Sequence, residues 1–264
     1  MFTIKKTVFF CLLLCFANKL VAVPAVVNPN LKTINISAGE WPPFLGESLP
    51  YQGVVAHLIR DIFAQAGIQV HFTFLPWGRA YHDTNNGKYD ATAVWMHSKD
   101  RTNAYLFSNA VLSEQFVFFH LKKNDFDWRD LNDLRGLIIG GGLNYSYGPV
   151  FDQAIEKNTF ELSRVSSTEQ NFRRLSVGRI DIFAEEKNVG YYTLNNQHPE
   201  LADTITHHPT AFLTNESFVL FPKNTEQSEQ LLTTFNHYLL QFKQDGRYQA
   251  YFEGLQKGDY QLAK

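Results

Sequence analysis

The amino-acid sequence predicts an α/β protein with two lobes and a ligand cleft between them. Short β-prone runs alternate with amphipathic helical runs, an order that produces parallel sheets covered by helices. The alternation occurs in two series, residues 33–121 and residues 137–244, which only short connections join. Two such series favour two lobes over one continuous sheet, and ligand sites commonly lie between lobes.

The first series opens with a β-loop-α-β unit. Thr33–Ala38 is a β-prone run, and it ends at Gly39–Phe44, where two consecutive prolines forbid a central strand. After Gly53, apolar residues recur at helical spacing up to Gly67, which suits a helix C-cap. Val70–Leu75 then predicts a second strand. Such a unit implies a parallel sheet whose functional loops lie at the carboxyl ends of the strands.

The other elements follow the same pattern. The first series continues with a polar helix at 79–86 and strands at 89–94 and 115–121. The second series predicts strands at 137–139, 160–165, 181–184 and 218–221, and helices at 147–158, 166–177, 189–196 and 226–244. Ser166 and Glu169 have capping-box spacing. Gly140–Gly142 lacks both the dinucleotide fingerprint and a P-loop lysine, so we expect a flexible loop before a helix whose free N–H groups can hold an anion.

Residues 1–22 read as a cleaved secretion signal. Lys5 and Lys6 precede the apolar run Val8–Phe16, and small residues follow it. This run is too short to span a bilayer, although an uncleaved anchor is the alternative interpretation. Cys11 and Cys15, the two cysteines of the chain, both lie in this segment, so the mature protein would contain no disulfide.

Composition narrows the classes of function. Cleavage would remove three lysines and no acidic residue, so the formal net charge would change from −2 to −5, which disfavours nucleic acid as a partner. The nine histidines form no H-x-x-x-H pair and have no cysteine partner, so we expect no metal site and no cofactor. Ser146 lacks the context of a nucleophile elbow, so a hydrolase triad is not supported.

Several motifs, in their joint order and spacing, resemble those of the extracellular solute-binding proteins of the amino-acid (family 3) class, which serve ABC importers. The likeness covers nearly the whole mature chain. The matching segments are Trp41-Pro42-Pro43-Phe44, Gly53, Gly87-Lys88-Tyr89-Asp90-Ala91, Ser98-Lys99-Asp100-Arg101, Phe107-Ser108, Leu134-Arg135-Gly136 and Gly178-Arg179-Ile180-Asp181.

The resemblance implies a periplasmic-binding-protein-like type II fold, in which two α/β lobes are joined by two crossover segments with a ligand cleft between them. Residues 23–112 and 216–264 would form one lobe, and residues 113–215 would form the other. The crossings would lie near Ser113 and Asn215. The resemblance also implies a periplasmic location.

The same resemblance implies a set of ligand contacts. Arg101 would receive a ligand carboxylate, and Trp41 and Trp77 would be aromatic walls. Glu186 falls at the position that in many members receives an ammonium group. The loop residues Tyr145, Ser146 and Tyr147 would offer hydroxyl and backbone donors. Trp95 joins this set, although amino-acid binders usually present small hydroxyl residues in its segment.

The chemistry of these residues suits the implied roles, with alternatives left open. A guanidinium is always charged, and its planar fork matches a carboxylate, whereas an isolated arginine is commonly a solvated surface charge. Trp77 could equally be a core residue. Glu185 and Glu186 are adjacent, so only one of them would face the cleft from a strand end. We prefer Glu186, with a solvated acidic pair as the alternative.

The resulting expectation is a monomeric binding protein without catalytic chemistry. It would capture an amino acid or a related zwitterion or organic anion, and present its closed form to the membrane permease of an ABC importer or to a membrane sensor. One alternative is a periplasmic enzyme on the same fold, similar to cyclohexadienyl dehydratases, in which Glu186 or Glu40 would act as general acid. A sensory ligand-binding adaptor is a further alternative.

Overall fold

The computed structural model describes residues 33–143, 145 and 147–262. The predicted signal at 1–22 and the predicted contact Ser146 lie outside these residues. One mixed sheet runs through the molecule in the order β2-β1-β3-β10-β5-β8-β6-β7, with β4 paired to β10 and β9 paired to β5. The expectation that two lobes would exclude a continuous sheet was therefore wrong, because β5 and β10 pair with strands at both ends of this order. In this described part of the chain, no helix combines the length and the apolar character needed to cross a bilayer.

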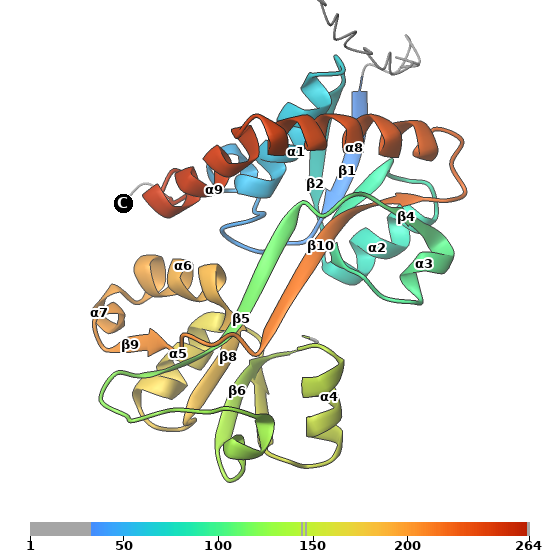
Figure 1. Cartoon of the computed structure of the whole chain (residues 1–264). Coiled ribbons are helices and arrows are strands. Elements are labelled where there is room, and N and C mark those ends of the chain that lie inside the picture. Colours follow the sequence, from blue (N-terminus) through green and yellow to red (C-terminus); the bar gives the residue numbers. More distant parts are fainter. Residues whose placement is uncertain (1–32, 144, 146, 263–264) are drawn as a thin grey trace, which may run out of the picture.

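The elements at both ends of the described chain form what we call the first lobe (Figure 1). Its parallel strands are β1 (Thr33–Ala38), β2 (Gln69–Phe74) and β3 (Ala91–Met96), and β4 (Tyr105–Phe107) pairs with the far end of β10. Its helices are η1 (Pro50–Gln52), α1 (Val54–Ala64), α2 (Trp77–Asn85), α3 (Arg101–Ala104), α8 (Ser228–Gln244) and α9 (Arg247–Lys257).

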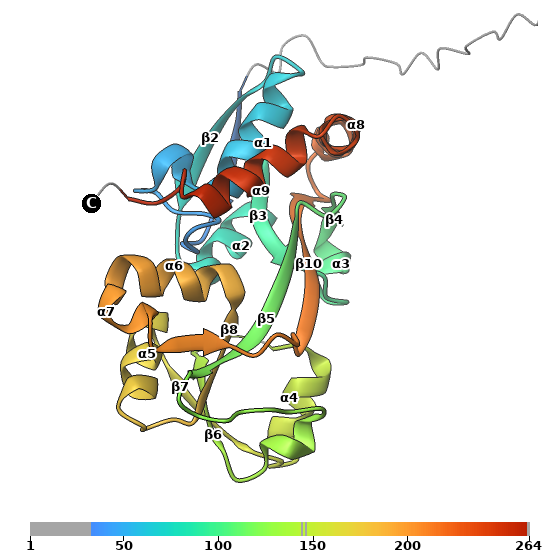
Figure 2. The same cartoon turned by 60° about the vertical axis from the view of Figure 1, so that its left-hand side comes forward.

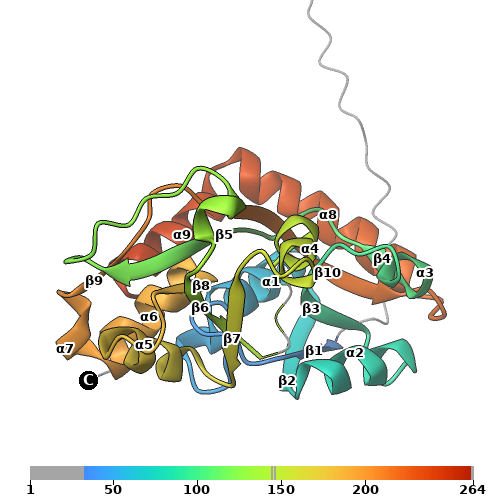
Figure 3. The same ribbon diagram turned by 90° about the horizontal axis from the view of Figure 1, so that it is seen from below.

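Helices cover both faces of this first sheet. Ile36 belongs to a buried apolar group, the first-lobe core, together with residues of α1 and α8. Ser37 points to the opposite face, where its hydroxyl contacts the Ala80 carbonyl oxygen of α2 at 3.1 Å. Figure 3 shows α8 and α9 on one side of these strands and α2 on the other.

The middle of the chain forms the second lobe. Its strands are β6 (Ile138–Gly142), β7 (Glu161–Val165), β8 (Ile182–Glu186) and β9 (Ile205–His207), and β6 pairs in parallel with both β7 and β8. Its helices are η2 (Leu131–Leu134), α4 (Pro149–Glu156), α5 (Thr168–Ser176), α6 (Lys187–Gln197) and α7 (Pro199–Ala202). A buried group that includes Phe118 and Phe151 forms the second-lobe core, and a further group around Phe119 packs on the other face.

Two long strands join the lobes. β5 (Leu112–Leu121) and β10 (Leu213–Pro222) run antiparallel through both of them (Figures 1 and 2). Ser113 lies opposite Glu216, and Glu114 lies opposite Asn215, so the two predicted crossings are neighbours in one ladder. The lobe boundaries themselves stay a prediction. Along β5 the side chains from 112 to 116 alternate between buried and exposed, so one face of the ladder is turned inward.

The structure corrects two local predictions. Gly140–Gly142 is the second half of β6 and not a flexible loop, since Gly141 pairs with Arg164 of β7. A Cβ at Gly140 would lie 2.4 Å from Ile180 Cδ1, so close packing explains a glycine in this strand. The cap of α5 is Ser167 and not Ser166, because the Ser167 hydroxyl accepts from the Gln170 N–H at 3.2 Å.

Candidate functional site

Three aromatic side chains gather at the carboxyl end of β3. The Trp77 and Trp95 ring centroids are 5.2 Å apart with the planes at 86°, and the Tyr81 ring lies 5.3 Å from that of Trp95. Trp95 Nε1 donates to Thr92 Oγ1 at 3.0 Å, which fixes the indole. Trp77 also packs against the first-lobe core, so its core role and its place beside Trp95 are compatible.

Arg101, the first residue of α3, stacks on this aromatic group. Its Cζ lies 5.0 Å from the Trp95 ring centroid, a cation–π distance, and Nη1 donates to the Met96 carbonyl oxygen at 2.7 Å. Partial burial lowers the pKa of Arg101, which still leaves it charged at neutral pH. No acidic side chain within the described ranges forms an ion pair with it. The guanidinium is therefore held in place, and no described acidic residue serves as its counter-ion.

Trp41 lies where the two lobes meet. Its backbone closes a tight loop after β1, with Trp41 N donating to the Leu45 carbonyl oxygen at 2.8 Å. The indole packs against both the first-lobe and the second-lobe core. Burial raises the pKa of the Tyr145 hydroxyl, and a hydrogen bond from the Trp41 side chain partly opposes this rise. Two predicted ligand contacts from opposite lobes are thus neighbours.

Arg164 of β7 holds the loop that carries Tyr145. Its Nη1 donates to the carbonyl oxygens of Gly142 at 2.6 Å and Tyr145 at 2.8 Å, and its Cζ lies 5.5 Å from the Tyr147 ring centroid. The Tyr147 hydroxyl accepts from the Gly142 N–H at 2.6 Å. Sequence reasoning missed Arg164. The available signal was its position at the carboxyl end of a strand in a parallel sheet.

Glu186 caps helix α6. Its Oε2 accepts from the backbone N–H groups of Asn188 at 2.7 Å and Val189 at 3.0 Å, and Asn188 Nδ2 donates to its Oε1 at 3.1 Å. The residue is 0% exposed, and burial raises its pKa to about 7. Its predicted contact with a ligand ammonium stays a prediction, and in this arrangement both of its oxygens already accept hydrogen bonds.

Glu185 points to the other face of β8, toward α5. Its Oε2 accepts from the Thr168 hydroxyl at 2.7 Å, and its Oε1 accepts from the Glu186 N–H at 2.8 Å. Burial raises its pKa to about 7. Burial is the main cause that raises the pKa of Tyr145, and the charge of Glu185 is the second. The charge of Glu186 has a smaller effect in the same direction. The structure therefore adds Glu185 to the groups around the Tyr145 loop.

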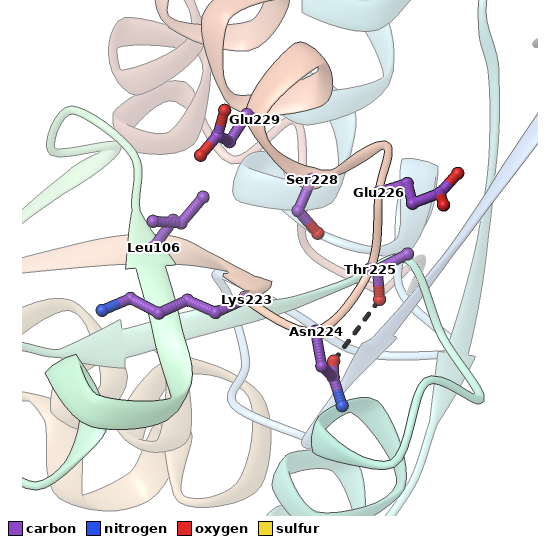
Figure 4. A pocket seen from close by; sticks show the side chains of 7 residues that line it. All are labelled: Leu106, Lys223, Asn224, Thr225, Glu226, Ser228 and Glu229. Atoms are coloured by element: carbon purple, nitrogen blue, oxygen red, sulfur yellow. Dashed lines mark hydrogen bonds between the residues drawn. The ribbon is translucent and has the colours of Figure 1, made fainter.

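Two surface hollows lie away from these residues. One, of about 490 Å³, is at the start of α8 and is lined by Lys223, Thr225 and Ser228 among others (Figure 4). The other, of about 380 Å³, lies beside Lys122 and Leu201 in the second lobe. None of the predicted ligand contacts that the structure describes lines either hollow. The predicted cleft stays a prediction that rests on the contacts above.

Comparisons with known proteins give a family and a fold. The sequence profile of the bacterial extracellular solute-binding proteins, family 3, matches residues 34–254. A search of curated proteins found no match. An ancestral arginine-binding protein bound to arginine is 19% identical, with a TM-score of 0.68 over 85% of this chain and 98% of that one.

Two further solved structures are similar to this chain. The amino acid ABC transporter substrate-binding protein AbpA from Streptococcus pneumoniae, bound to L-arginine, is 14% identical, with a TM-score of 0.67 over 88% of this chain and 97% of that one. The ancestral amino-acid-binding protein AncCDT-1, a precursor of cyclohexadienyl dehydratase, is 18% identical, with a TM-score of 0.65 over 85% and 95%. These similarities confirm the predicted type II periplasmic-binding fold.

Proposed function

Because this chain belongs to the bacterial extracellular solute-binding proteins of family 3, we propose that it captures an amino acid, or a related zwitterion or organic anion, between its two lobes. The observation that carries the proposal is the Arg101 guanidinium, which is partly buried and stacked on Trp95 without an acidic partner in the described chain. A ligand carboxylate would supply the missing counter-ion through two parallel hydrogen bonds.

The geometry also explains why binding would close the lobes. Contacts from both lobes stabilise only the closed arrangement, so a ligand shifts the equilibrium toward it. Arg101 and the aromatic group belong to the first lobe, and Tyr145 and Glu185 belong to the second. Glu186 of the second lobe is the proposed contact for a ligand ammonium, which would take the place of one of the hydrogen bonds that its carboxyl now accepts. Two of the similar structures hold arginine, which makes L-arginine the first solute to test.

Replacement of Arg101 tests this proposal. In a thermal-shift screen of amino acids, polyamines and carboxylates, a solute that binds the native state raises the melting temperature, and calorimetry with that solute then gives its affinity. Arg101→Ala should abolish binding, and Arg101→Lys should weaken it strongly because the bidentate fork is lost. Arg79→Ala is the control, since Arg79 is an exposed cation of the same lobe that pairs with Asp83. Unchanged affinity in Arg101→Ala would reject the proposed site.

The proposed partner is the membrane permease of an ABC importer, with the periplasm as the place of action. The similarity to AbpA, described as an ABC transporter substrate-binding protein, supports this role. Ligand-dependent co-purification of the tagged protein with a permease would test it. Recovery of a membrane receptor in place of a permease would favour the sensory role.

Glu185 favours one second candidate, an enzyme acting on a bound organic acid. A buried carboxyl with a pKa near 7 beside two tyrosines can act as general acid at neutral pH. The similarity to AncCDT-1 supports this candidate. Glu40 is less suited, because it is exposed and accepts from the Glu47 N–H of its own loop. Incubation with prephenate or arogenate tests the activity, and a product lost in Glu185→Gln would establish it.

A further inference from the structure

A buried carboxyl lies in the middle of the ladder that joins the lobes. Glu114 of β5 is 0% exposed, and it lies opposite Asn215 of β10. Its Oε2 accepts from Asn215 Nδ2 at 3.4 Å, and the Ser217 hydroxyl is a second donor to the carboxyl. Among the residues that the structure describes, its Oε1 has no hydrogen-bond partner. The two strands that join the lobes, β5 and β10, therefore face each other at a buried carboxyl group that lacks part of its hydrogen bonds.

The charged groups around Glu114 do not neutralise it. Lys187 of α6 donates to the side chain of Gln115 at 2.9 Å, and Gln115 is exposed on the outer face of β5. Lys243 of α8 donates to the Ala110 carbonyl oxygen at 2.8 Å, and its electrostatic partner is Glu216, which is also on the outer face.

On the inner face the neighbouring titratable group is another acid. Glu186 of β8 lies opposite Phe116, which shares the inner face with Glu114. The carboxyl of Glu186 is engaged by the start of α6, and Glu185 points to the other face of β8. Within the described ranges no lysine, arginine or histidine forms an ion pair with Glu114. A negative charge at this position would therefore be desolvated and uncompensated.

Such a carboxyl binds a proton more tightly when it is buried than when water reaches it. Burial raises the pKa of Glu114 to about 7, and its two hydrogen bonds only partly oppose that rise. A movement that opens the ladder to water would return the pKa toward its ordinary value. Each pKa unit of difference between two arrangements changes their ratio about tenfold on deprotonation.

We propose that Glu114 is a proton-operated switch in the hinge: the proton-bound carboxyl favours the described arrangement of the lobes, and loss of the proton favours a more open one. This inference rests on the proposed opening and closing of the lobes about β5 and β10. It adds that release of the solute is promoted as the surroundings become less acidic.

The distance between the lobes tests the switch directly. Spin labels on the substitutions Lys99→Cys and Val150→Cys use exposed positions next to α3 and in α4, which belong to different lobes (Figure 1). Cys11 and Cys15 of the full chain are replaced by serine so that only these two sites react. In the ligand-free protein, the population with the longer distance should grow about tenfold or more between pH 5 and pH 9, with a midpoint near 7.

Glu114→Gln should remove this transition, because the neutral amide retains the size of the protonated acid and cannot lose a proton. Glu216→Gln, on the exposed outer face of the same ladder, is the matched control and should keep it. Asn215→Lys leaves Glu114 in place and supplies a cation opposite it, so the midpoint should move to lower pH. Circular dichroism confirms that each variant is folded.

The outcomes separate the switch from the proposed function. An unchanged transition in Glu114→Gln, or no transition in the parent protein, would overturn the switch even if L-arginine or another solute shortens the distance. A transition that depends on Glu114 would support the switch even if no solute in the thermal-shift screen binds. Failure of every solute to bind or to shorten the distance would count against the proposed function alone.

Discussion

At the scale of single residues, the predicted aromatic wall depends on a glycine. Gly39 follows β1, and a Cβ built on it would lie 2.2 Å from two ring carbons of Trp77. No side chain larger than hydrogen fits there unless the indole moves. The position of Trp77, and through the ring contact that of Trp95, is therefore set partly by a residue that contributes no side chain.

Gly39→Ala should consequently destabilise the protein by about 1–3 kcal/mol, as overpacking of a filled site does. Urea unfolding followed by tryptophan fluorescence measures the change. Gly78→Ala is the control, because a Cβ at Gly78 meets nothing within 4 Å and alanine favours helix α2. The control should be neutral or slightly more stable. Equal stability of Gly39→Ala and the parent protein would show that the indole is free to shift.

At the scale of secondary-structure elements, the start of α6 is determined by a carboxylate. Glu186 is the last residue of β8 and the N-cap of α6, and it accepts from the second and third N–H groups of the helix. The strand-to-helix junction is thus built around the residue that sequence similarity assigns to the ligand.

Glu186→Ala should cost about 1–2 kcal/mol of unfolding free energy through loss of this cap. Glu186→Gln keeps an acceptor oxygen in place, so it should lose less. Denaturant unfolding of both variants, in the absence of any solute, measures the structural role separately from a role in binding. If Glu186→Ala proved as stable as the parent protein, the cap would contribute nothing.

At the scale of the whole molecule, three buried carboxyls make stability depend on pH. The pKa values of Glu114, Glu185 and Glu186 are each raised from 4.5 to about 7, with burial as the largest cause. At a pH between 4.5 and 7 the folded state binds more protons than the unfolded state. The contribution of the three carboxyls to stability is therefore complete below pH 4.5 and is lost as the pH rises toward 7.

We expect the unfolding free energy to fall as the pH rises from 4.5 to 7, by at most on the order of 1 kcal/mol per pH unit for each carboxyl. Two histidines act in the opposite sense, because partial burial lowers the pKa of His120 and His207. The measurement is therefore the difference in unfolding free energy between the parent protein and the triple Glu→Gln variant. A difference that stays constant over this range would contradict the assigned protonation.

The sequence determined the order of most elements and the class of the fold, although it did not predict β4, β9, α3, α7 and α9. β1 has the predicted bounds, and the helices after Gly53 and Ser167 begin within two residues of their predicted starts, because local periodicity and capping residues decide such segments. β10 was predicted only at 218–221, whereas it begins at Leu213. The first half of β10 is polar because only one face of the β5–β10 ladder is buried there. It therefore lacks the apolar pattern by which a buried strand is predicted.

Tertiary structure alone decided how the candidate site is assembled. Alternation showed that Glu185 and Glu186 point to opposite faces, but only the pairing of β8 and the start of α6 determined which of them caps a helix. Arg164 and Glu114 carried no local motif. Their surroundings come from residues 22 and 101 positions away in the chain, as the bonds to Gly142 and Asn215 show. Contacts of that range depend on how the chain packs, and local periodicity contains no information about them.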